Sequence, residues 1–119
     1  MPNNNTRTYV KAAVQALDSK RGEDIQVLRV GDLTTLAEYF VICAANSTTQ
    51  VKTLADEVEF RLKTDYGVVP HHIEGHDSAS WILIDYGFAL VHVFLEEARN
   101  FYGLEKLWKD AVQIPLDEL

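Results

Sequence analysis

The stretch WILIDYGFALVHVFL, Trp81–Leu95, decides how this chain folds. Two runs rich in β-branched and aromatic residues flank Tyr86-Gly87. This pattern is typical of a β-hairpin with a tight turn, in which glycine supplies the positive φ. We therefore predict strands over Ala79–Asp85 and Phe88–Leu95.

The two faces of this hairpin differ in chemistry, because side chains alternate along a strand. A two-residue loop places Asp85 opposite Phe88, and the same register places Trp81 opposite His92. One face is aliphatic and suits packing under a helix; its residues are Ile82, Ile84, Ala89, Val91 and Val93. The other face mixes aromatic side chains with a carboxylate and an imidazole; its residues are Trp81, Leu83, Asp85, Phe88, Leu90, His92 and Phe94.

Two interpretations of this mixed face stay open on the pattern alone. Tryptophan is enriched in binding hot spots, which favours contact with a partner. Sheets that contain parallel strands are usually covered on both sides, which favours a second helix over this face with His92 as a satisfied core histidine.

Upstream residues supply the other strands of the sheet. Apolar residues at helical spacing predict a helix over Thr6–Lys20. Runs rich in β-branched residues predict strands over Asp24–Val30, Tyr39–Ala45 and Val68–Glu74. The Tyr39–Ala45 run is apolar on both faces, which is typical of a central strand.

The remaining segments predict two further helical regions. Ser47-Thr48-Thr49-Gln50 fits a capping box and starts a long helix that ends at Gly67. A C-terminal helical region starts at Glu96 and breaks near Gly103, and Leu116–Leu119 is expected to be a loose tail. The order α-β-β-α-β-β-β-α predicts a single-domain α/β sandwich with a mixed five-stranded sheet. The domain spans residues 1–119, with its core at about 6–111.

Composition narrows the class of partner. The chain has 119 residues, of which 47% are hydrophobic and 24% charged, with a net charge of −7. Residues 66–119 carry nine acidic and three basic groups. Such a surface repels phosphate, so broad binding to nucleic acid is excluded and a basic protein partner is favoured. The start is polar and no stretch has the ~20 apolar residues of a membrane helix, so a cytoplasmic location is expected.

Motifs for catalysis are weak. His72, Glu74 and His76 would share a face of an extended strand and could bind zinc, but an exposed polar strand end and loop is the favoured interpretation. Cys43 lies in an apolar run and is expected to be a buried, inert thiol. Ser47 lacks the flanking glycines of a nucleophile elbow. We expect no cofactor and no resident metal.

Several motifs, in their order and spacing, resemble the Iojap family, the ribosomal silencing factors. The resemblance covers roughly Val10 to Ala111, with one departure at Glu38, where the family more often has aspartate. The motifs are Glu38-Tyr39-Phe40-Val41-Ile42, Ser47-x-x-Gln50, Glu74-Gly75, Trp81-Ile82-Leu83-Ile84-Asp85-Tyr86-Gly87, Val91-His92-Val93-Phe94 and Arg99-x-x-Tyr102-x-Leu104-Glu105-x-Leu107-Trp108.

This resemblance implies a translation regulator and not an enzyme. Family members bind the large (50S) ribosomal subunit through ribosomal protein L-fourteen and sterically block association with the small subunit. They act when nutrients are scarce, and they can form homodimers. The resemblance implies no direct DNA or membrane partner. The family fold is similar to that of nucleotidyltransferases, but no strand here carries the Asp-x-[Asp/Glu] pair that would hold catalytic metals.

The resemblance also favours the partner interpretation of the mixed face. The tryptophan that the family uses in ribosomal-protein contact looks like Trp81. We expect Trp81 and Leu83 to form an apolar anchor, and Glu74 and Asp85 to pair with basic residues of the ribosomal protein. The full set of expected binding residues is Glu74, Trp81, Leu83, Asp85, Leu90, His92 and Phe94. A metal-dependent or nucleotidyltransferase-like enzyme is the alternative.

Overall fold

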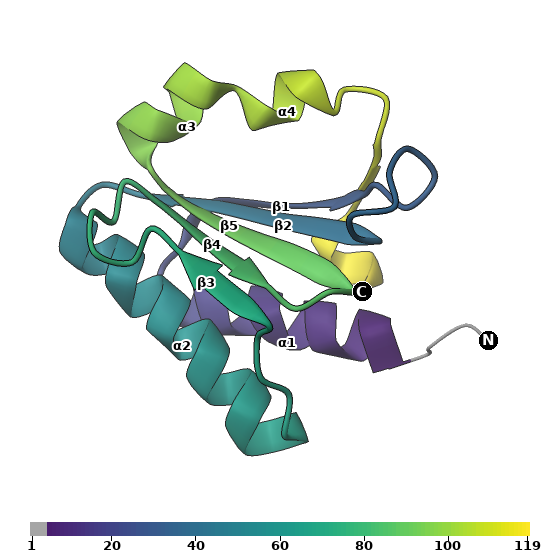
Figure 1. Cartoon of the computed structure of the whole chain (residues 1–119), viewed down its shortest axis with the longest axis horizontal. Helices are drawn as coiled ribbons and strands as arrows, with labels where there is room; N and C mark the ends of the chain where they lie inside the picture. Colours follow the sequence, from purple (N-terminus) through teal and green to yellow (C-terminus); the bar gives the residue numbers. More distant parts are fainter. Residues whose placement is uncertain (1–4) are drawn as a thin grey trace.

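A mixed sheet lies between two layers of helices in the computed structural model, which describes residues 5–119 apart from the side chains of Glu105 and Leu107. The polar start at residues 1–4 lies outside the described residues. Helices α1 and α2 lie together on one side of the sheet, and α3 and α4 lie on the other (Figure 1). This arrangement confirms the predicted α/β sandwich.

The sheet has six strands, in the order β3-β4-β5-β2-β1-β6, where five were expected. Strands β2 and β5 pair in parallel, and all other neighbours are antiparallel. The additional strand is β6, which pairs with β1 at the edge. The strand bounds are β1 Glu23–Arg29, β2 Tyr39–Ala45, β3 His72–Glu74, β4 Trp81–Asp85, β5 Ala89–Leu95 and β6 Val112–Ile114.

The helices form close to the positions that the sequence predicts. Their bounds are α1 Asn5–Ser19, α2 Thr48–Tyr66, α3 Glu96–Tyr102 and α4 Leu104–Leu107. The Ser47 hydroxyl accepts a hydrogen bond from the Gln50 backbone N–H at 3.1 Å, as an N-cap does. The other half of the expected capping box, from the Ser47 N–H to the Gln50 side-chain oxygen, does not form between these two described residues; the side-chain NH2 of Gln50 donates to the Lys20 carbonyl. Gly103 separates α3 from α4, which confirms the predicted break.

Two apolar cores result from the two helical layers. The larger one lies between the sheet and α1 and α2, and it contains the aliphatic hairpin face as predicted: Ile82, Ile84, Ala89, Val91 and Val93. The smaller one lies on the opposite side of the sheet, and its fully or mostly buried members are Leu28, Val30, Ala37, Phe40, Ile42, Phe94 and Leu104. Strand β2 is buried at every position, as a central strand between two layers must be.

The hairpin register differs from the expected one. Asp85 pairs with Leu90, and Trp81 pairs with Phe94. The Asp85 carboxylate accepts the Gly87 N–H at 2.8 Å, which tightens the turn one residue beyond the predicted position. Because the pairing shifts by two residues, and side chains alternate with a period of two, the same residues still share each face of the hairpin. Phe88 is the exception, since it lies in the turn and packs on Tyr9 of α1, on the other side of the sheet.

The chain after Asp110 is also more regular than expected. Strand β6 extends the sheet, a short 3₁₀ turn covers Leu116–Glu118, and Leu119 packs against the larger core. The Arg7 guanidinium donates to the Glu118 carbonyl at 3.1 Å. The core therefore continues past residue 111. Strand β3, by contrast, is shorter than predicted: it covers His72–Glu74, whereas the expected strand was Val68–Glu74.

The β3–β4 turn depends on a glycine that a side chain cannot replace. Gly75 has φ +84°, and a Cβ built there would lie 2.0 Å from the Trp81 carbonyl oxygen. Gly67, at the end of α2, has φ +66° and open space around it. Gly67→Ala carries only the left-handed strain, about 1 kcal/mol, whereas Gly75→Ala must also displace the backbone of β4.

We predict that Gly75→Ala lowers the free energy of unfolding at least about twice as much as Gly67→Ala. Urea unfolding of the two variants measures the difference. Equal losses would contradict the close approach of the turn to Trp81.

Candidate functional site

The residues of the expected binding set come together on one face of β3, β4 and β5. Register places Glu74 beside Leu83, and Leu83 beside His92. The same register places Asp85 beside Leu90. Since directly paired residues share a face, the set forms one surface across three strands.

This face is covered by helices in part only. Phe94 is fully buried and His92 is 4% exposed, so neither side chain reaches the surface. Trp81, Leu83, Asp85 and Leu90 are partly buried, and Glu74 is exposed. The two interpretations that the sequence left open therefore each describe a part of the face. We define the Trp81 surface as the accessible part together with Tyr102 of α3: Glu74, Trp81, Leu83, Asp85, Leu90 and Tyr102.

Trp81 has a fixed orientation because three aromatic neighbours contact it. Its indole N–H donates to His92 Nδ1 at 3.1 Å. The Phe94 ring stacks on it at a centroid distance of 4.9 Å and an interplanar angle of 28°. Tyr102 approaches from α3 at 4.8 Å. A large side chain held in this way presents its free edge without further ordering.

Tyr102 was not among the residues predicted for the site. It is 49% exposed, and its neighbour Phe101 is 82% exposed. The spacing of Arg99 and Tyr102, three residues apart, predicts that they lie close together on one helix, but it does not indicate that Tyr102 contacts Trp81. Arg99 is 4% exposed, and its guanidinium donates to the Asp24 carbonyl at 2.7 Å. This contact fixes α3 to β1 and so positions Tyr102 against Trp81.

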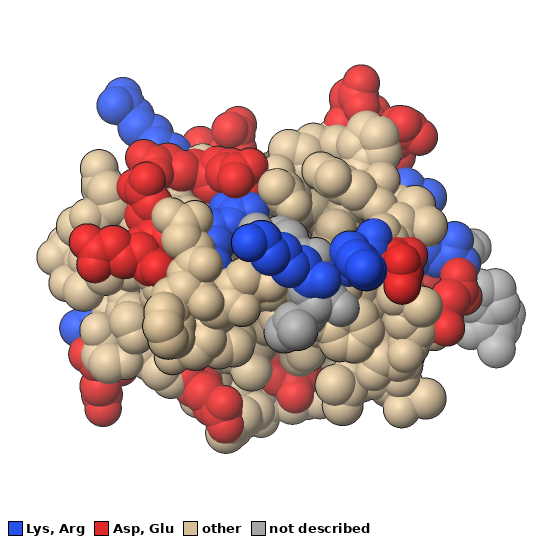
Figure 2. Space-filling model, turned by 90° about the horizontal axis from the view of Figure 1, so that it is seen from above, with Lys and Arg blue, Asp and Glu red and all other residues tan. Residues whose placement is uncertain are grey.

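Charged groups on this side of the molecule carry both signs. Figure 2 looks down on the α3–α4 side, where acidic side chains gather towards the rim and basic ones lie across the middle. Glu74 Oε1 lies 2.8 Å from His72 Nε2. Asp85 uses one carboxylate oxygen to hold the Gly87 N–H of its own turn. Glu74 is thus the more accessible of the two carboxylates for a basic partner.

The three residues of the possible zinc site do not converge. His72 Nε2 contacts Glu74, whereas His76 Nε2 lies 3.0 Å from Asp56 Oδ1 on α2. No group of three metal-ligating side chains occurs in the part of the chain that the structure describes. This geometry gives the metal-dependent alternative no support.

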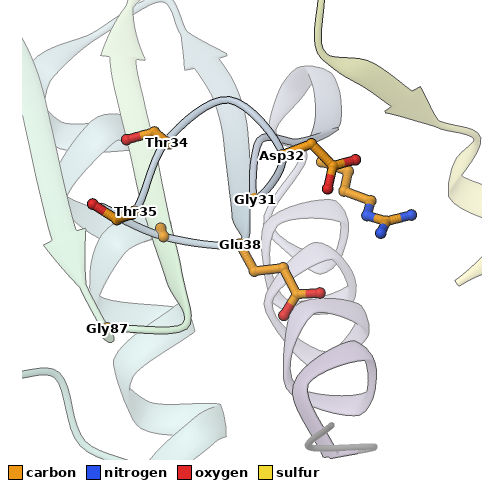
Figure 3. A pocket seen from close by; sticks show the side chains of 8 residues that line it. Gly31, Asp32, Thr34, Thr35, Glu38 and Gly87 are labelled. Carbon is orange, nitrogen blue, oxygen red and sulfur yellow. The ribbon is translucent and has the colours of Figure 1, made fainter.

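Other chemical candidates are equally poorly placed. Cys43 is buried, as predicted, and burial raises the pKa of its thiol to about 12, which disfavours the reactive thiolate at neutral pH. A hollow of about 360 Å³ lies beside the loop between β1 and β2. In Figure 3 the Thr34 and Thr35 side chains point to one side of this loop while Asp32 and Glu38 point elsewhere, so its polar groups do not converge on one point. Among residues 5–119, no helix combines the length and the hydropathy that a membrane span needs.

Burial lowers the pKa of His92 from its ordinary value of 6.5 to about 4. The folded protein therefore keeps this imidazole neutral over a pH range in which the unfolded chain binds a proton. The resulting stability is fully present above pH 6.5 and is lost as the pH falls towards 4.

We predict that His92→Phe removes this part of the acid sensitivity. Between pH 7 and pH 4 the wild type should lose on the order of 2–3 kcal/mol more stability than the variant. Urea unfolding at a series of pH values measures both slopes, and the other titrating groups are common to the two proteins. Parallel pH curves would mean that His92 is not buried in its neutral form.

Comparisons with known proteins agree with the motifs. A family model described as ribosomal silencing factor during starvation matches residues 3–119. The ribosomal silencing factor RsfS of Bacillus subtilis is 41% identical over 113 residues, which is 95% of each chain. The chloroplastic protein Iojap of Arabidopsis thaliana is 35% identical over 107 residues, covering 90% of this chain and 44% of its own.

A solved structure agrees with the fold. The crystal structure of a Chromobacterium violaceum protein superimposes with a TM-score of 0.84 at 38% identity, covering 87% of this chain and 86% of the other. Sequence and fold thus match the same family over almost the whole chain. The chain belongs to the ribosomal silencing factor family.

Proposed function

We propose that this protein is a translation repressor that binds the large (50S) ribosomal subunit at its L-fourteen protein and sterically blocks association with the small subunit. Membership of the silencing-factor family supports ribosome association and translational repression. The main support for the proposed binding site is the state of Trp81, which is partly exposed and held in one orientation by His92 and Phe94.

The Trp81 surface has the composition of a protein-binding patch. Trp81, Leu83, Leu90 and Tyr102 supply aromatic and aliphatic area at its centre, and interface hot spots are rich in such residues. Glu74 lies at the margin, where a carboxylate can pair with lysine or arginine of the ribosomal protein. Asp85 has a second role in its own turn, so its contribution to binding is harder to isolate.

The acidic character of the domain favours protein over RNA. A net charge of −7 is repelled by the ribosomal RNA that surrounds any ribosomal protein. Attraction to a basic protein then raises specificity more than affinity.

Repression requires no covalent chemistry. The molecule measures 39 × 34 × 26 Å, and a body of this size at the subunit interface obstructs the approach of the small subunit. We accordingly propose a role as a steric inhibitor without enzymatic activity.

Truncation of the anchor should abolish most of the binding. We predict that Trp81→Ala folds but binds large subunits more weakly by about 2 kcal/mol or more. Co-sedimentation with purified large subunits measures the loss. Phe60→Ala is the matched control, because Phe60 is a 63% exposed aromatic residue on α2, across the sheet from Trp81.

One outcome would count against the anchor. A folded Trp81→Ala protein that co-sediments like the wild type would show that Trp81 is not the anchor. Light scattering of both proteins separates ribosome binding from a homodimer, since a dimer formed through this surface would dissociate in Trp81→Ala.

Charge reversal tests the electrostatic component. We predict that Glu74→Lys weakens binding and reduces its dependence on salt, because one attractive pair becomes repulsive. Asp65→Lys makes the same change of charge at an exposed position on α2 and should leave binding unchanged. Equal effects of the two variants would indicate a response to net charge instead of local pairing.

Subunit joining tests the function itself. Large subunits preincubated with the protein and then mixed with small subunits should yield fewer joined ribosomes in a sucrose gradient, and Trp81→Ala should restore joining. Unimpaired joining at saturating wild-type protein would refute steric repression.

A further inference from the structure

We infer that His92 is a positioning residue: its Nδ1 accepts the Trp81 indole N–H and holds the indole in the orientation that binds the partner. This inference rests on the proposed function, and it assigns His92 a role other than the direct contact that the sequence suggested. At 4% exposure its side chain cannot itself form an interface.

The histidine ring is itself held in place by its neighbours. Phe40 contacts it edge-on at a centroid distance of 4.9 Å, and Phe94 lies parallel to it at 6.1 Å with an interplanar angle of 10°. Both neighbours are buried. The Nδ1 acceptor therefore has a fixed position, and the 3.1 Å hydrogen bond transfers that position to Trp81.

The hydrogen bond also determines the tautomer. Because Nδ1 accepts a hydrogen bond from the Trp81 indole N–H, the proton of the neutral His92 ring must lie on Nε2. Nε2 is buried and has no hydrogen-bond partner among the described residues. A buried donor without a partner lowers stability, so His92 is a poor choice for packing alone. An apolar side chain of similar volume would fill the site without that cost.

An apolar residue at position 92 could not supply a hydrogen-bond acceptor for the Trp81 indole N–H. Only the Nδ1 lone pair bonds the indole N–H, and the low pKa of the ring keeps that lone pair free at neutral pH. Without the bond, the indole could rotate between Phe94 and Tyr102, and binding would have to order it again. His92 thus lowers stability and raises the affinity for the partner.

Two variants separate these effects. His92→Phe keeps an aromatic ring but has no acceptor. His92→Asn keeps an acceptor close to the Nδ1 position, but it leaves a void and an unpaired amide. We expect His92→Phe to unfold at an equal or higher temperature than the wild type, and to bind large subunits about 5- to 10-fold more weakly. We expect His92→Asn to unfold at a lower temperature and to bind more tightly than His92→Phe.

The opposite ranking of the two variants in stability and in affinity is the decisive result, because a purely structural residue would move both together. Wild-type affinity in a folded His92→Phe protein would overturn the inference. So would parallel losses of stability and affinity in both variants. His92→Leu replaces His92→Phe if the larger ring does not fit.

An NMR measurement tests the positioning role without the ribosome. The chain has two tryptophans, so two indole N–H resonances are expected. In His92→Phe the Trp81 resonance should shift and its contacts to Tyr102 should weaken, while the Trp108 resonance changes much less. An unchanged Trp81 resonance and unchanged contacts would overturn the inference. If wild-type protein fails to bind large subunits while this shift occurs, the proposed function fails and the positioning of Trp81 stands.

Discussion

The parallel pairing of β2 with β5 is the constraint on which the rest of the structure depends. Seven residue pairs join these strands in the middle of the sheet. Parallel neighbours need a crossover, and here α2, β3 and β4 lie between them in the chain. Because β2 is buried on both faces, helices must lie on both sides of it. The layer above is supplied by α3 and α4, which directly follow β5 (Figure 1).

The shortness of that upper layer explains why the Trp81 surface remains accessible. Helix α3 has 7 residues and α4 has 4, which is enough to bury Phe40, Ile42 and Phe94. Strand β4 lies one position further out, beyond β5, and its upward side chains are covered only in part. The same packing that closes the core over β2 therefore leaves Trp81 and Leu83 partly exposed, while His92, Phe94 and Tyr102 contact the Trp81 ring.

The sequence predicts much of this architecture because its strongest signals are local. Alternation along the hairpin identified the two faces, and a register error of two residues left that assignment intact. Strand β6 was missed because three residues, Val112–Ile114, carry too little pattern, and only pairing with β1 makes them a strand. Burial of His92 and Phe94 was one of two interpretations that the pattern left open, because the choice depends on how far two short helices extend across the sheet. The approach of Tyr102 to Trp81 depends on the Arg99–Asp24 contact, which joins residues 75 positions apart.

The two edge strands, β3 and β6, each have only 3 residues. Each exposes few unpaired backbone groups, and proline lies close by at Pro70 and Pro115. Short edges of this kind offer little template for a further strand, so they protect a sheet against edge-to-edge aggregation. Any assembly of this domain, with itself or with another protein, must accordingly be built from side chains on its faces and not from an extension of its hydrogen-bond ladder.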